Sequence, residues 1–221
     1  MNTRFNARGG DAVIDSTRTH KDSFSDIYAN EAPPWDTGRP QPPFVDAAAR
    51  IVSPVLDCGC GTGGMAIFFA EQGHTVTGID FVPQAIDSAK RKAAEKGGLS
   101  VRFLVKDAMT LEHWDERFAT ILDSGLFHIY TAEERTRYVR GLANIVKAGG
   151  LLLLFCFSDE CPASPNGGVS RRELEQAFSD GWTIESLELR DSELNPAFMA
   201  AHPQAFAGGL KMWFAVIRRD A

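Results

Sequence analysis

The chain of 221 residues lacks a long apolar segment and an excess of basic residues. Its longest apolar run, residues 151–157, is far too short to cross a bilayer, and the polar first 21 residues do not resemble a signal peptide. We therefore expect a cytoplasmic protein without a membrane partner. The 23 Lys and Arg residues are outnumbered by 29 Asp and Glu, and the formal net charge is -6. General nucleic-acid binding requires a basic face, so we expect no nucleic-acid partner.

Cysteine is scarce as well. Four cysteines in a chain of this length do not suggest a disulfide framework. Cys58 and Cys60 form a C-x-C pair, but no second C-x-x-C pair and no nearby pair of histidines accompanies them, so we expect no metal site. Hydrophobic residues make up 44% of the chain, which is enough for the buried core of one α/β domain.

The most informative stretch is VLDCGCGTGG, residues 55–64. An apolar run leads into an acid, glycines follow at every second position, and a helical pattern begins at once. Strand, glycine turn and helix in this order are typical of a nucleotide-binding loop. The glycines allow a sharp turn and let a ligand lie against bare main chain.

Two patterns fit this stretch. Gly59, Gly61 and Gly64 match the dinucleotide pattern G-x-G-x-x-G, which would suit an NAD(P)-dependent reductase. Asp57, Gly59, Gly61 and Gly63 match D-x-G-x-G-x-G. The acid decides between them, because a carboxylate two residues before the first glycine would repel a diphosphate. A cofactor that carries positive groups and no phosphate tolerates that acid.

Further acids follow the next expected strands, at residues 75–80, 101–105 and 118–122. The carboxyl ends of parallel strands form one rim of an open sheet, and ligands bind there. At such a rim, an acid can accept hydrogen bonds from ribose hydroxyls or from an adenine amino group. The three acids are Asp80, Asp107 and Asp123.

Residues 32–221 are expected to form the single domain, after a flexible N-terminal segment at 1–31. Residues 32–43 hold five prolines around Trp35 and Arg39, so they can be neither a helix nor an inner strand. A linker would explain the prolines but seldom needs a tryptophan, so we favour a lid over a ligand.

The loop after the fourth expected strand places aromatic residues beside His128. Its unperturbed pKa lies near neutrality, so His128 is the candidate general base, with a structural role as the alternative. Another long loop, expected as an insertion at 191–209, lies between the last two strands. Several aromatic residues could line a substrate pocket or belong to the core. They are Tyr28, Phe127, Tyr130, Phe157 and Phe198.

With these residues in place, the chain resembles the class I S-adenosylmethionine (SAM)-dependent methyltransferases over residues 32–218. The acid-glycine pattern looks like motif I, Gly78 to Asp80 like motif II, and Asp107-Ala108 like the adenine-contact motif. The resemblance implies an α/β fold with a Rossmann-like seven-stranded sheet, mostly parallel, with helices on both faces. The implied strand order is 3-2-1-4-5-7-6, with strand seven antiparallel.

The resemblance implies SAM as cofactor, with the methionine end over the glycine turn, the ribose on Asp80 and the sulfonium covered by Trp35. The expected cofactor-binding residues are Trp35, Arg39, Asp57, Gly59, Gly61, Gly63, Asp80, Phe81, Asp107, Ala108 and Asp123.

Residues 34–40 are similar to the N-terminal segment of the thiopurine, halide/thiol and mycobacterial heterocyclic-toxin (quinolone) methyltransferases. This implies methyl transfer to a small aromatic or heterocyclic acceptor but does not fix the acceptor atom. We favour O-methylation over N or S and expect a monomer or homodimer. Apart from the reductase, the remaining alternative is a non-catalytic SAM-binding protein.

Overall fold

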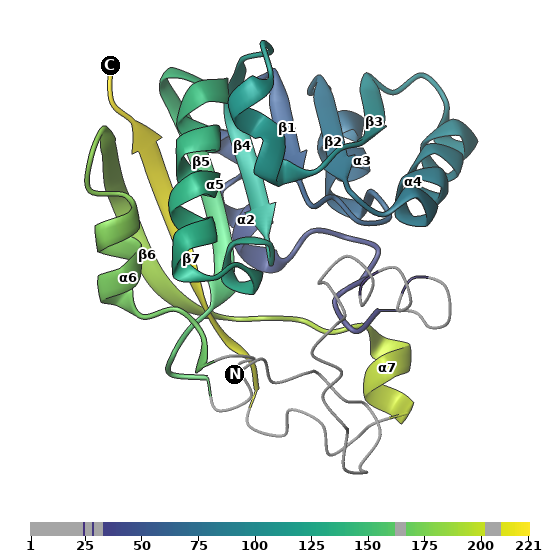
Figure 1. Ribbon diagram of the computed structural model, residues 1–221. Coiled ribbons are helices and arrows are strands. Elements are labelled where there is room, and N and C mark those ends of the chain that lie inside the picture. Colours follow the sequence, from purple (N-terminus) through teal and green to yellow (C-terminus); the bar gives the residue numbers. More distant parts are fainter. Residues whose placement is uncertain (1–23, 25–27, 29–32, 162–166, 202–208) are drawn as a thin grey trace.

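The computed structural model describes residues 24, 28, 33–161, 167–201 and 209–221. Within them, seven strands form one sheet in the order β3-β2-β1-β4-β5-β7-β6, which confirms the predicted order (Figure 1). Strands β1 to β5 are parallel, and β7 runs antiparallel to both β5 and β6. The strands are β1 (Val55–Cys58), β2 (Val76–Asp80), β3 (Val101–Val105), β4 (Phe118–Ser124), β5 (Val146–Phe157), β6 (Trp182–Asp191) and β7 (Lys211–Arg219).

Helices cover both faces of the sheet, as expected (Figure 1). One face carries α2 (Pro42–Asp46), η1 (Ala48–Arg50), α3 (Gly64–Glu71) and α4 (Pro83–Lys96). The other carries η2 (Ala108–His113), η3 (Phe127–Ile129), α5 (Ala132–Ile145) and α6 (Arg171–Ala177). The short helix α7 (Pro196–Ala201) follows β6.

Burial on both faces explains the apolar run of β5. Leu152, Leu154 and Cys156 pack in the core with α5 and α6, while Leu153 and Phe155 pack in the core with α2, α3 and α4. A strand covered on both sides needs apolar residues at every position rather than at every second one. In the part of the chain that the structure describes, no helix is both long and apolar enough to span a membrane.

The parallel pairing brings the acids of successive strands to one end of the sheet. Asp57 pairs in register with Gly78, and Cys58 pairs with Asp123. Asp80 is the last residue of β2, and Asp107 caps η2 just after β3. The predicted rim of acids is therefore present, and the glycine turn between β1 and α3 lies within it.

The turn requires glycine at position 63. Gly63 caps α3 with φ +84°, and a Cβ there would lie 2.8 Å from Ala89 Cβ and 2.9 Å from Phe103 Cζ. Gly98 has φ +66°, but a Cβ there would meet nothing within 4 Å.

We predict that Gly63→Ala is clearly more destabilising than the matched control Gly98→Ala. Both variants pay about 1–2 kcal/mol for the left-handed backbone, and Gly63→Ala adds about 1–3 kcal/mol for the overlap with two buried side chains. Urea denaturation of the two variants measures the difference. Equal losses in the free energy of unfolding would contradict this packing.

Candidate functional site

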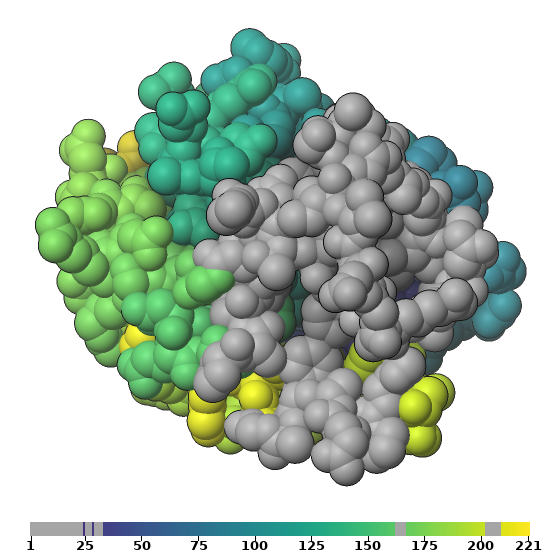
Figure 2. All heavy atoms as spheres, turned by 60° about the horizontal axis from the view of Figure 1, so that its bottom comes forward, coloured from purple at the N-terminus to yellow at the C-terminus, as the bar shows by residue number. Residues whose placement is uncertain are grey.

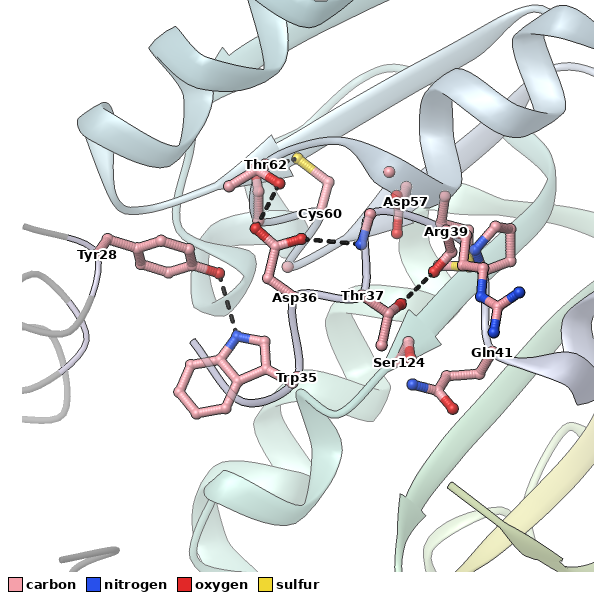
Figure 3. Close-up of a pocket in the computed structure, with 16 residues that line it drawn as sticks. Tyr28, Trp35, Asp36, Thr37, Arg39, Gln41, Asp57, Cys60, Thr62 and Ser124 are labelled. Atoms are coloured by element: carbon pink, nitrogen blue, oxygen red, sulfur yellow. Dashed lines mark hydrogen bonds between the residues drawn. The ribbon is translucent and has the colours of Figure 1, made fainter. Parts of the chain in front are cut away.

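A cavity lies at the rim, between the glycine turn after β1 and the proline-rich segment before α2 (Figure 3). Figure 2 shows the molecule from the bottom of Figure 1, where the carboxyl ends of the parallel strands lie, with α7 in yellow-green on the same side as α4 in blue. The cavity lining consists of Tyr28, residues 35–41, Asp57, residues 59–62, Gly64, Met65 and Ser124. The expected lid and the expected cofactor loop thus face each other across one cavity.

Asp57 is the most unusual group of this cavity. Its side chain is buried, and neither carboxyl oxygen has a hydrogen-bond partner among the described residues. Burial, reinforced by the negative charges of Asp80 and Asp123, raises the pKa of Asp57 to about 8, and the nearby Ala66 amide offsets this only in part. An unpaired buried carboxyl is costly. A carboxyl group in this position suits a ligand that brings a positive group or a hydrogen-bond donor. The amino group of SAM is such a group.

Asp80 shapes the turn from the neighbouring strand. Its Oδ2 accepts a hydrogen bond from the Gly61 amide at 2.9 Å, and its Oδ1 accepts one from the Val82 amide at 2.9 Å. Burial raises the pKa of Asp80, although these amide bonds oppose the shift. Each carboxylate oxygen can accept more than one hydrogen bond, so the predicted bond to ribose hydroxyls stays compatible with this geometry.

An aromatic cluster lies beside the glycine turn. Phe24 packs on Trp35 and Phe81, with ring centroids 5.5 and 5.9 Å away, and Trp35 Nε1 donates a hydrogen bond to the Tyr28 hydroxyl at 3.2 Å. The Tyr28 hydroxyl would lie 2.7 Å from a Cβ on Gly61, so only glycine permits this approach. Tyr28, predicted for the substrate pocket, therefore lies against the cofactor loop, beside the predicted cofactor residues Trp35 and Phe81.

Arg39 lines the cavity, but its guanidinium is largely exposed and forms an ion pair with Glu193 at 2.8 Å. The predicted cofactor contact of Arg39 stays a prediction. Ten other residues of the lining were not predicted as site residues, among them Asp36, Gln41, Thr62 and Ser124. The only sequence signal for the first two was their position within the proline-rich segment around Trp35.

Asp123 was expected to bind the cofactor, but it lies inside the protein and does not line the cavity. Its Oδ1 accepts hydrogen bonds from the Leu126 and Phe127 amides at 2.9 and 3.3 Å, and its Oδ2 accepts one from the Tyr138 hydroxyl at 3.0 Å. Burial raises the pKa of Asp123 to about 7. These bonds hold the turn after β4, and the predicted cofactor contact of Asp123 stays a prediction.

Phe127 was expected to line the substrate pocket, but its side chain is fully buried in the core. Its ring lies 5.8 Å from that of Phe178 and 6.5 Å from that of Tyr138, measured between centroids. The one-turn helix η3 directs Phe127 inward toward α5 and α6, and no sequence pattern in so short an element distinguishes the inward residue from its neighbours. Tyr130 also lies in this core, with its ring centroid 5.2 Å from that of Tyr138.

Asp107 and Ala108, the predicted adenine contacts, lie at the start of η2. Asp107 Oδ1 accepts the Met109 amide at 2.9 Å, and Ala108 is buried. These residues are at the carboxyl end of β3, next to β2 in the sheet, so they lie on the same rim as Asp80. Their contact with adenine stays a prediction.

His128 lies in η3, beside the end of β5. Its Nδ1 accepts a hydrogen bond from the Phe157 amide at 3.3 Å, and its ring packs edge-on against that of Phe157, 4.6 Å between centroids. Burial and the positive charge of Arg135 lower the pKa of His128 to about 3. The ring is therefore neutral with its proton on Nε2. The occupied Nδ1 and the low pKa weigh against a role as general base, which stays a prediction.

Residues 55–150 match a family model described as a methyltransferase domain. Over 217 residues the chain is 33% identical to 2-heptyl-1-hydroxyquinolin-4(1H)-one methyltransferase of Mycobacteroides abscessus, which covers 93% of this chain and 92% of that protein. The chain belongs to the SAM-dependent methyltransferases. SAM is accordingly the cofactor of this methyltransferase, and the NAD(P)-dependent alternative is set aside.

Two further proteins that are similar to this methyltransferase are named for other chemistry. It is 29% identical over 168 residues to a probable thiol methyltransferase of Arabidopsis thaliana, which covers 74% of each chain. It is also 32% identical to a protein whose solved structure concerns the conversion of a disulfide bond into a thioacetal group during echinomycin biosynthesis. That structure has a TM-score of 0.77 and covers 90% of this chain and 91% of its own.

Proposed function

We propose that this methyltransferase transfers the methyl group of SAM to a small aromatic or heterocyclic molecule, at oxygen in preference to nitrogen or sulfur. The use of SAM is supported by the buried carboxyl of Asp57 in the wall of the cavity, which has no hydrogen-bond partner among the described residues. For the acceptor, the support is the match along nearly the whole of both chains to a protein named for a 1-hydroxyquinolone. The chain acts as a monomer or homodimer.

On the cofactor side, this chain would contribute binding and orientation. SAM supplies a methyl group bonded to a positively charged sulfur. Asp57 would hold its amino group, the amides of the glycine turn would face its methionine end, and the aromatic ring of Trp35 would face the sulfonium, where an aromatic face favours a cation. Asp80 would accept the ribose hydroxyls, while Asp107 and Ala108 would contact adenine.

On the acceptor side, we propose that catalysis consists mainly of placement and exclusion of water. Ser124 lines the cavity, and a Cβ built on the adjacent Gly125 would lie 3.6 Å from His128 Cε1, so His128 is close to this end of the cavity. Phe157 packs on His128, and Phe198 lies on α7. We assign Phe157 and Phe198 to the wall of the acceptor site.

The proposal predicts release of S-adenosylhomocysteine when the enzyme is given SAM and a 1-hydroxyquinolin-4-one. Phenols, aromatic thiols and iodide form the comparison panel, and mass spectrometry of the product identifies the methylated atom. We expect the highest kcat/KM with the hydroxyquinolone and methylation at its oxygen. Selective methylation of a thiol would overturn the preference for oxygen. Tight SAM binding without turnover on any acceptor would point to a non-catalytic SAM-binding protein.

A second prediction concerns His128, measured with the best acceptor of that panel. Because Nδ1 already accepts the Phe157 amide, we expect His128→Ala to lower kcat by less than about tenfold, with SAM affinity unchanged. A general base contributes about 10²–10⁴-fold. A loss of that size would establish His128 as the base.

A further inference from the structure

The segment that covers the cavity is bonded to the glycine turn on one side. Thr62 Oγ1 donates a hydrogen bond to Asp36 Oδ2 at 2.8 Å and accepts one from Lys92 Nζ at 2.6 Å. A Cβ on Gly64, the first residue of α3, would lie 2.9 Å from the carbonyl carbon of Gly38. Residues 33–41, which we call the cover, are therefore seated directly on the loop that holds the methionine end of SAM.

The same cover is bonded on its other side to the chain after β6. The Gln41 side chain is buried, and its Nε2 donates to the Glu193 carbonyl at 2.9 Å while its Oε1 accepts the Glu193 amide at 2.8 Å. The Asn195 amide donates to the Pro34 carbonyl at 2.8 Å, and Asn195 Nδ2 donates to the Asp36 carbonyl at 2.9 Å. These four bonds join segments that are more than 150 positions apart in sequence.

Asn195 also organises the segment that it belongs to. Its Oδ1 accepts the Ala197 amide at 2.9 Å, and its carbonyl accepts the Met199 amide at 3.0 Å. The first turn of α7 is thereby fixed to the residue that contacts the cover. Since α7 carries Phe198, Asn195 links the proposed acceptor wall to the cover.

Burial strengthens the two bonds of Gln41, whereas Asn195 is half-buried. Gln41 is 8% exposed, so breaking its paired bonds would leave buried polar groups without partners. The nearby ion pair between Arg39 and Glu193 is exposed, with 68% and 40% of the side chains accessible, and such pairs contribute little. The amide bonds of Gln41 and Asn195 are therefore the main connection between the two segments.

We propose that the cover and residues 192–201 form one unit in which Gln41 and Asn195 are positioning residues that couple SAM binding to the acceptor side. A ligand in the cavity contacts both the glycine turn and the cover, so it orders the cover, and the amide bonds transmit that order to α7. The coupling must be reciprocal, so a bound acceptor also raises the affinity for SAM. The assignment of α7 to the acceptor rests on the proposed function.

The test uses hydrogen exchange of the Glu193 and Asn195 amides in the full-length enzyme, with and without SAM, and needs no acceptor. We expect SAM to increase the protection of both amides by about fivefold or more in the wild-type enzyme. In Asn195→Asp, which keeps the oxygen that caps Ala197 but loses the donor to the Asp36 carbonyl, the SAM-dependent gain should be almost entirely lost, because one hydrogen bond accounts for a change of about fivefold. Gln41→Ala should have the same effect on Glu193.

Asn144→Asp is the matched control. Asn144 Nδ2 donates to the carbonyls of Leu111, Glu112 and Trp114, so the same substitution removes an amide donor between α5 and η2, away from the cover. It should lower overall stability and leave the SAM-dependent protection at 193 and 195 intact. The proposal is overturned if SAM does not change exchange at these amides, or if the gain persists in both Asn195→Asp and Gln41→Ala. Because no acceptor is present, a wrong acceptor class does not affect this result.

Discussion

The architecture of the site depends on a carboxyl group that is buried without a partner. Asp57 sits near the end of a strand covered on both faces, and neither of its oxygens is hydrogen-bonded within the described residues. Asp80, one strand away, satisfies its oxygens with the amides of the turn itself. The rim therefore combines one acid that builds the loop with one whose oxygens have no hydrogen-bond partner among the described residues. The carboxylate form of Asp57 would suit a cationic cofactor and oppose a diphosphate.

The unpaired carboxyl also explains why the cavity needs a cover. Electrostatic attraction between Asp57 and a bound cation is stronger when water is excluded. The segment 33–41 closes the cavity with a backbone stiffened by proline and held at both ends by side-chain hydrogen bonds. Tyr28 and Phe24 contact Trp35 of this cover and extend its aromatic surface toward Phe81. The charge of Asp57 and the exclusion of water by segment 33–41 would thus both favour a bound cation.

The sequence could predict the sheet and its rim, because β1, β2 and β4 are short, mostly apolar runs with an acid at or near their ends, and parallel strands end on one side. The sequence could not show which of these acids forms hydrogen bonds within the fold and which has oxygens without a partner among the described residues. Asp123 has the same strand-end position as Asp80, yet Tyr138 from a distant helix and two local amides occupy its oxygens. Phe127 turns into the core within a one-turn helix too short for any periodicity. The bonds between Gln41 and Glu193 join positions far apart in the chain, which local patterns cannot reveal.

The most direct test of this account is the number of protons released when SAM binds, measured by titration calorimetry at about pH 6.5 in buffers of different ionisation enthalpy. Asp57, with a pKa of about 8 before binding, is protonated at this pH and should ionise when a cation approaches. We predict release of close to one proton in the wild-type enzyme and none in Asp57→Asn. In the wild type, SAM affinity should also rise with pH up to about 8. Binding without proton release, or equal release in both proteins, would contradict the account.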